Sequence, residues 1–120
     1  MDEIEGLLKA CKVLFDYSLQ AVGVAHVLVD DQGEPYDFHY EYLNQSMANI
    51  SGASITDLVG INAYEYWGND DMSWLNHFAD AAFLGKASEF ETVAILFEQF
   101  HHVYVTPFAP GYCTFVIQDV

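Results

Sequence analysis

The order of its strand-like and helical patterns constrains this chain more than any other feature of the sequence. Two strand-like segments, 23–29 and 36–43, come first, and three more, 89–97, 100–106 and 112–120, close the chain. A block of helical patterns separates the two groups. Strands and helices grouped in this way favour an antiparallel sheet covered by helices. We therefore expect an α+β fold with one five-stranded antiparallel sheet.

The second strand-like segment has the clearest periodicity. Aromatic and polar residues alternate from Tyr36 to Tyr42. A period of two over seven residues indicates a half-buried strand, with Asp37, His39 and Glu41 on its polar face. A turn rich in Asp, Gly and Pro, residues 30–35, joins it to the Val-rich segment before it. The two segments are expected to form a hairpin.

The first 20 residues have a helical pattern. Apolar side chains recur every three or four positions and form one stripe of a helix: Ile4, Leu8, Cys11, Phe15 and Leu19. Such a stripe needs a surface to cover it, which is either the second face of the sheet or another copy of the chain. We divide the chain into this helix, 1–20, and a domain, 21–120, and expect a homodimer through the helix.

The middle block predicts three short helices and one long helix. Asn44 can cap the first, a turn near Ser54 can open the second, and residues 63–67 form the third. The run Asn69–Asp70–Asp71 favours the start of a longer helix, 72–84, which Gly85 ends. The inner face of this long helix would carry Trp74, Phe78, Ala81 and Ala82.

The charge of the chain limits the classes of molecule that it is expected to bind. The net charge is -15, with three Lys and no Arg. Such a surface repels phosphate backbones, so nucleic-acid binding is not expected. Without Arg the chain also lacks the usual clamp for phosphate or carboxylate groups, which favours a small, neutral or apolar ligand. No apolar run reaches the roughly 20 residues that cross a bilayer, so no membrane partner is expected.

Metal and catalytic chemistry find little support in the sequence. Cys11 and Cys113 lie far apart in the sequence, with no Cys or His nearby at the spacing of a metal site. We expect both to be reduced, buried thiols of a cytoplasmic protein. His101 and His102 are neighbours on a strand, so their side chains point to opposite faces and cannot chelate one ion together. No convergent set of nucleophile, base and acid is visible. We expect no bound metal and no enzymatic activity.

Four local motifs support a family resemblance. The segment Tyr42–Met47 joins a strand to a short helix through Asn44. In the segment 50–62, Gly52 and Gly60 lie before and after a second short helix. Gly85–Glu91 joins the long helix to a strand, and the last strand ends in Val116–Val120. In this order the motifs resemble the PAS family of bacterial sensory domains, over roughly residues 20–120.

The resemblance implies a sensory, non-enzymatic role in signal transduction. It implies a PAS-like five-stranded antiparallel sheet with a helical block on one face, preceded by the N-terminal amphipathic helix. In many PAS proteins the residue at Asp119 is followed by an output domain, such as a histidine kinase or a diguanylate cyclase. We accordingly expect a cytoplasmic fragment of a larger bacterial signalling protein, with an output domain joined after Asp119.

The resemblance also places a ligand pocket between the helices and the sheet. Aromatic side chains with a few polar tips would suit a small flat or apolar molecule. The expected pocket residues are Tyr64, Trp67, Trp74, His77, Phe78, Phe90, Tyr104 and Phe115. Alternatively these rings simply fill the core, and the chain is a ligand-free PAS module for protein interaction and dimerisation. An enzyme of the α+β cone type is disfavoured, because the long helix lies between the two strand groups.

Cofactors known in the family are not expected here. Light-sensing members carry a reactive Cys where this chain has Ala63, so a flavin adduct is excluded and only non-covalent flavin remains. His77 is the one residue on the long helix that could bind haem iron, at the margin of the inner face. The absence of Arg removes the usual partner of haem propionates.

Overall fold

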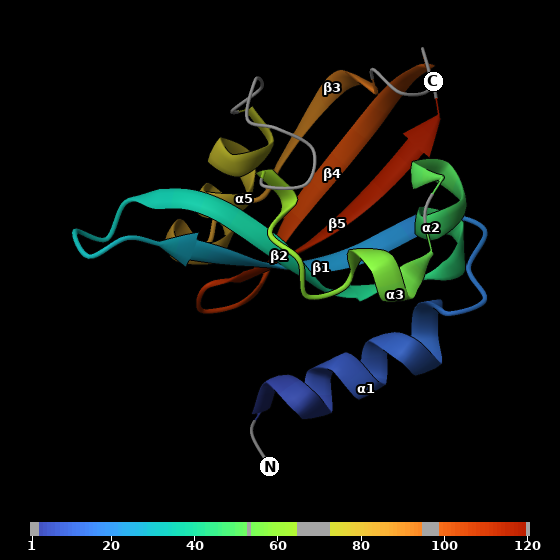
Figure 1. The fold of residues 1–120 in the computed structure, drawn as a ribbon, viewed down its shortest axis with the longest axis horizontal. Coiled ribbons are helices and arrows are strands. Elements are labelled where there is room, and N and C mark those ends of the chain that lie inside the picture. The colour runs from blue at the N-terminus through green and yellow to red at the C-terminus, as the bar shows by residue number, and fades with distance from the viewer. Residues whose placement is uncertain (1–2, 53, 65–72, 95–98, 120) are drawn as a thin grey trace.

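The computed structural model confirms the α+β architecture, and it describes residues 3–52, 54–64, 73–94 and 99–119. One sheet joins the strands in the order β2-β1-β5-β4-β3, and every neighbouring pair is antiparallel. The first hairpin therefore pairs with the closing three strands through β1 and β5 (Figure 1). The strand bounds are β1 Ala21–Val29, β2 Pro35–Leu43, β3 Ser88–Ala94, β4 Gln99–Ala109 and β5 Tyr112–Asp119.

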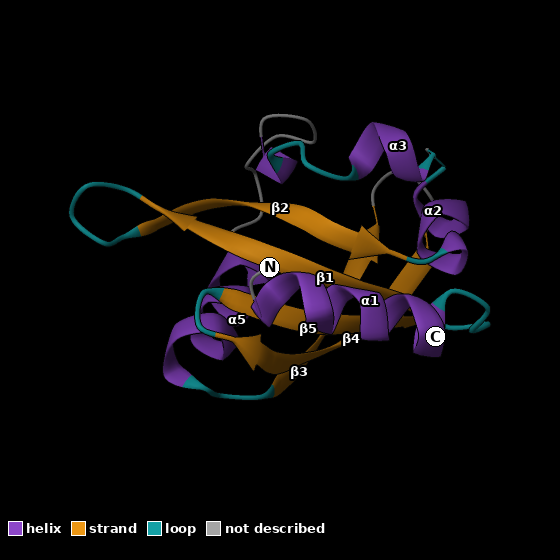
Figure 2. Cartoon of the chain, turned by 90° about the horizontal axis from the view of Figure 1, so that it is seen from below, coloured by secondary structure: helices purple, strands orange, loops and turns teal. Residues whose placement is uncertain are grey.

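Helices cover the two faces of the sheet unequally. The long helix α5, Ser73–Leu84, packs its predicted apolar side on the face that we call the inner face, where Phe78 is fully buried. The short helices α2, Gln45–Ser51, and α3, Ile55–Leu58, follow β2. The N-terminal helix α1, Glu3–Phe15, crosses the opposite, outer face (Figure 2). Within the described ranges no helix is long and apolar enough to cross a membrane.

Helix α1 covers its own sheet, and it is shorter than predicted. Leu8, Cys11 and Phe15 pack against Val24 of β1 and neighbouring aromatic residues, so most of the predicted stripe is covered within the chain. The prediction that the helix continues to residue 20 is wrong. The helix ends at Phe15, and Leu19 lies 98% exposed beyond it.

Asn44 explains why α1 ends where it does. The side-chain amide of this fully buried residue donates to the carbonyls of Phe15 and Gln20, at 2.9 and 2.8 Å. Its Oδ1 accepts from the N–H groups of Val22 and Met47, both at 3.0 Å. The bond to Met47 is the predicted N-cap of α2. One side chain thus joins the end of α1, the start of β1 and the start of α2.

Strand β2 departs from simple alternation at Glu41. Tyr42 pairs with Val24 and Tyr40 with Ala25, so Glu41 is an extra residue in the ladder, a β-bulge. The bulge turns Tyr42 to the outer face, where it packs with the α1 cluster, while Tyr40 stays in the inner core. The sequence pattern had placed both rings on one face, and that prediction is wrong for Tyr42.

Asp37 is buried, although the alternation placed it on the polar face of β2. Its carboxylate accepts the N–H groups of Phe38 and Tyr64, at 2.7 and 2.9 Å. Tyr64 ends a segment, 59–64, that forms bridges with the free edge of β2. The carboxylate therefore helps to hold this segment on the edge strand, which is otherwise open to pairing with another chain.

The remaining element predictions are largely confirmed. Strand β4 was expected to stop before Pro107, but it continues to Ala109. Pro107 lies beside a register shift and beyond the last residue pair with β3, so its missing N–H removes no bond to that strand. Of the predicted helix 63–67 only 63–64 is described as helical, and the acidic helix start at 69–71 lies outside the described residues. The predicted turn at Glu98–Gln99 is described only at Gln99, which already belongs to β4.

We predict that Asn44→Ala lowers the free energy of unfolding by about 3 kcal/mol. The substitution removes a helix cap and leaves the buried N–H of Val22 without the side-chain oxygen that accepts it. Urea unfolding followed by circular dichroism measures the loss. The matched control is Asn49→Ala, which removes only an exposed bond to Gln45. A similar loss in both variants would contradict the role given to Asn44.

We also predict that stability falls in alkali. Burial raises the pKa of the Cys113 thiol from 9.0 to about 12, and burial raises the pKa of Tyr40 as well. Above pH 9 the unfolded thiol ionises while the folded thiol keeps its proton, so the free energy of unfolding falls by up to about 1.4 kcal/mol per pH unit for this group. Urea midpoints between pH 7 and 11 test this. An unchanged slope in Cys113→Ala would count against it.

Candidate functional site

The inner face carries a layer of stacked aromatic rings. Phe78 of α5 lies over Phe115 of β5 with ring centroids 5.2 Å apart, and Phe38 of β2 meets Phe78 edge-on at 4.8 Å. Both Phe78 and Phe115 are fully buried. A glycine makes this packing possible, because a Cβ at Gly23 would lie 2.4 Å from the ring of Phe115. These rings form the closed floor of the layer.

A second set of rings forms a more open rim beside β3. Trp74 and His77 come from α5 and Phe90 from β3, and all three are partly buried. His77 stacks on Phe90 at 4.3 Å, and Trp74 meets Phe90 edge-on at 5.2 Å. His77 Nδ1 lies 2.8 Å from Ser88 Oγ, so Nε2 is the ring nitrogen that could meet a ligand. The rim therefore combines flat apolar surfaces with one polar atom.

Tyr64 links this layer to the edge of the sheet. Its hydroxyl accepts the N–H of Leu75, in the first turn of α5, at 3.2 Å. Its ring meets Phe38 edge-on, and its own N–H is held by Asp37. The start of α5 is thereby tied to β2 through one tyrosine.

The structure brings together six of the eight residues predicted to line a pocket: Tyr64, Trp74, His77, Phe78, Phe90 and Phe115. Tyr104 does not join them. Its neighbours Val103 and Val105 fill the inner core, so strand alternation places Tyr104 on the outer face, where it is 38% exposed and contacts His102. The prediction for Tyr104 is therefore wrong, and Trp67 lies outside the described residues.

The residues present do not fit a covalently attached flavin at position 63. Ala63 is buried in the inner core and offers no thiol. The two cysteines are elsewhere, Cys11 on the side of α1 that packs against the outer face and Cys113 in β5. For haem, the face of His77 is covered by Phe90 and its Nδ1 is engaged by Ser88. The expectation that the chain carries no cofactor stays a prediction.

The outer face has a groove that the sequence did not indicate. Its volume is about 590 Å³, and it opens between α1, β2 and α3. Lys12 and Asp16 line it from the side of α1, and Glu41 and Tyr42 from β2. Tyr42 donates its hydroxyl proton to Asp16 at 2.7 Å, and burial and this bond raise the pKa of the tyrosine. The groove lies on the face opposite the predicted pocket.

Histidines also gather on the outer face. His102 lies there beside Glu89 and Glu91, while the neighbouring His101 is buried, so the pair does face opposite sides as predicted. His26 and His39 were not singled out from the sequence. Burial chiefly, and then His39, lower the pKa of His26, against an opposing effect of Glu41. His39 and Glu41, two residues apart on one strand, were the only local signal of this group.

Comparison with known proteins identifies the fold. No family model and no curated protein matches the chain. Among solved structures, a LOV protein of Rhodobacter sphaeroides shares 15% identity with a TM-score of 0.68, covering 100% of this chain and 69% of that chain. The PAS domain of an HTR-like protein from Haloarcula marismortui shares 16% with a TM-score of 0.59, covering 98% and 94%.

A third structure agrees with these two. It is a light-oxygen-voltage domain whose mechanism was probed with a flavin analogue, and it shares 12% identity with a TM-score of 0.59, covering 96% of this chain and 84% of its own. At such identities the likeness concerns the fold alone. This chain has the PAS fold, with the five-stranded antiparallel sheet and the helical block that the sequence predicted.

Proposed function

We propose that this chain, which has a PAS fold, is a sensory domain that binds a small ligand and relays a conformational shift. The observation that carries the proposal is the half-open aromatic rim of Trp74, His77 and Phe90, lying between α5 and the sheet. In this proposal the domain acts in the cytoplasm of a bacterium and performs no catalytic step of its own.

The chemistry of the rim selects the ligand class. The fully buried rings of Phe78 and Phe115 close the floor, so a ligand would lie against the partly exposed rings beside β3. Flat aromatic surfaces bind flat apolar molecules, and His77 Nε2 offers one hydrogen bond. The net charge of -15 and the lack of Arg disfavour anions. We therefore propose a neutral aromatic metabolite.

The relay would run through the three closing strands. His77 of α5 is bonded to Ser88, at the start of β3, and β3, β4 and β5 are joined by continuous antiparallel ladders. Strand β5 ends at Asp119, where we propose that an output domain of the histidine kinase or diguanylate cyclase type is joined. A ligand shifts such an equilibrium only if it binds the two states unequally.

Ligand binding is tested with the purified chain. Native mass spectrometry should reveal a co-purified molecule, and thermal unfolding against a panel of neutral aromatic metabolites should show a raised Tm with the one that binds. Trp74→Ala and Phe90→Ala should weaken that binding by about tenfold or more, since each removes a stacking surface. Tyr36→Ala, an exposed aromatic of the β1–β2 hairpin, is the control. No adduct and no Tm shift across the panel would reject ligand sensing.

A ligand-free dimerisation module is the second candidate, and the outward side of α1 favours it. Val13 and Leu14 are 83% and 69% exposed there, turned away from the sheet. The helix also holds Lys9 and Lys12, two of the three lysines of the chain. In a protein of net charge -15, these lysines reduce the electrostatic repulsion that a second copy meets at this helix. We propose that a homodimer forms through this side of α1.

Sedimentation equilibrium tests the dimer. Leu14→Glu should raise the dimer dissociation constant by about tenfold or more, because it buries a charge in an apolar contact. Leu84→Glu changes an equally apolar and exposed residue at the end of α5, and it should leave the constant unchanged. Added salt should strengthen the dimer by screening the net charge. A monomer at all salt concentrations, or equal effects of the two variants, would reject it.

A further inference from the structure

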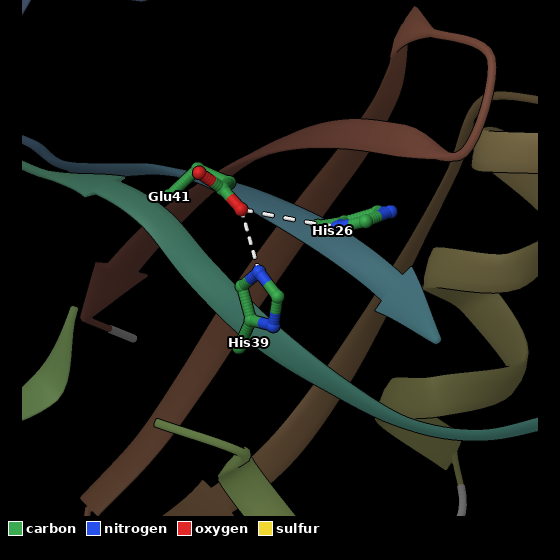
Figure 3. A group of neighbouring side chains, drawn as sticks. All are labelled: His26, His39 and Glu41. Carbon is green, nitrogen blue, oxygen red and sulfur yellow. Dashed lines mark hydrogen bonds and ion pairs between the residues drawn. The ribbon is translucent and has the colours of Figure 1, made fainter. Parts of the chain in front are cut away.

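A group of three metal-ligating side chains lies on the outer face of the first hairpin. His26 belongs to β1, and His39 and Glu41 belong to β2 (Figure 3). The ladder pairs His26 directly with His39, and their rings meet edge-on with centroids 5.1 Å apart. The group is separated by the sheet from the aromatic layer of the inner face.

The three side chains converge on one point. Both imidazole rings have a nitrogen close to the same carboxylate oxygen, Glu41 Oε1. This oxygen lies 2.5 Å from His39 Nε2 and 3.8 Å from His26 Nδ1 (Figure 3). One possible ligand atom from each residue lies within 4.8 Å of the others. Around a tetrahedral zinc ion, with bonds of roughly 2.1 Å, ligand atoms lie roughly 3.4 Å apart. Small side-chain rotations therefore bring all three atoms to one ion.

The surroundings hold this group in place and leave it accessible. The ring of His26 stacks on Tyr112 of β5, with centroids 4.3 Å apart and planes 11° from parallel. Glu41 is fixed at the β-bulge of β2. The side chains are 33%, 20% and 28% exposed for His26, His39 and Glu41, so an ion can enter from solvent and keep water as a further ligand. The net charge of -15 attracts cations to the surface.

His102, on the same face, also has two carboxylates nearby, but these do not converge on one point with its ring. His102 has Glu89 3.4 Å from Nε2 and Glu91 3.6 Å from Nδ1. The two carboxylates thus lie at different nitrogens of one ring and cannot meet at a single ion with it. Within the residues that the structure describes, the group at His26 is the one that satisfies the convergence needed for a metal.

We propose that His26, His39 and Glu41 bind one divalent transition-metal ion of the zinc class. The protein would supply two imidazole nitrogens and one carboxylate oxygen, with water completing the coordination. Imidazole suits Zn²⁺ and its neighbours, whereas Mg²⁺ and Ca²⁺ prefer oxygen ligands throughout. The ion would link β1 to β2 across the hairpin. This site goes beyond the proposed sensory function, because it lies on the opposite face and needs no ligand in the aromatic layer.

The test uses the full 120-residue chain, free of any affinity tag and treated with a chelator. Calorimetric titration with Zn²⁺ should show one ion bound per chain, and Co²⁺ should give the visible absorption of a coordinated ion. Zn²⁺ should also raise the Tm, since it binds the folded state. Absence of Zn²⁺ uptake by this chain overturns the proposal.

Three variants assign the site. His39→Ala and Glu41→Gln should each lower the Zn²⁺ affinity by about tenfold or more, because each removes a ligand. His102→Ala, a matched change on the same face, should leave the affinity within about twofold. Glu41→Gln keeps the size of the side chain and guards against a simple folding defect, which circular dichroism checks. An unchanged affinity in His39→Ala or Glu41→Gln, or an equal loss in His102→Ala, overturns the assignment.

Discussion

The hydrogen bonds of Asn44 determine how the parts of this chain are placed relative to one another. A buried amide has two donors and two acceptor lone pairs, and here each donor and the oxygen meet backbone groups of separate elements. The end of α1 and the start of β1 are fixed by the same side chain that caps α2. Since these backbone groups are buried or terminal, they need a partner within the protein. Asn44 thus fixes the end of α1, and the apolar contacts of Leu8, Cys11 and Phe15 hold the helix on the outer face.

With α1 on the outer face, the sheet presents two different environments. The inner face is buried at its centre and lined with aromatic rings, and among its described residues the rings of the rim beside β3 are partly exposed. The outer face combines the apolar contacts of α1 with histidines and carboxylates. In the functions that we propose, the inner face receives an apolar ligand and the outer face an ion, and the two faces belong to one sheet with β1 and β5 near its centre.

Patterns local in sequence predicted most of the fold, and their failures have identifiable causes. Hydrophobic periodicity indicated the two-plus-three grouping of strands and the inner face of α5. It does so because the buried residues of each segment recur with the period of a strand or a helix. The end of α1 was missed because Asn44, 29 residues after Phe15, takes up a carbonyl at the helix terminus. Tyr42 was placed on the wrong face because a bulge cannot be seen in a pattern of period two.

The residues of the candidate site were predicted in part, because some of them depend on local spacing and others on the tertiary structure. Trp74 and Phe78 lie four residues apart on one helix, so their spacing alone places them on the same face. For Tyr104, the face of the sheet depends on how β4 is placed in the sheet, which the residue pattern of that segment did not indicate. The sequence by itself determined the class of fold, the aromatic character of its core and the acidic surface, because these follow from composition and local period. Only the tertiary structure brought His26 within reach of His39 and Glu41, because pairing between strands, and not distance along the chain, decides which side chains converge.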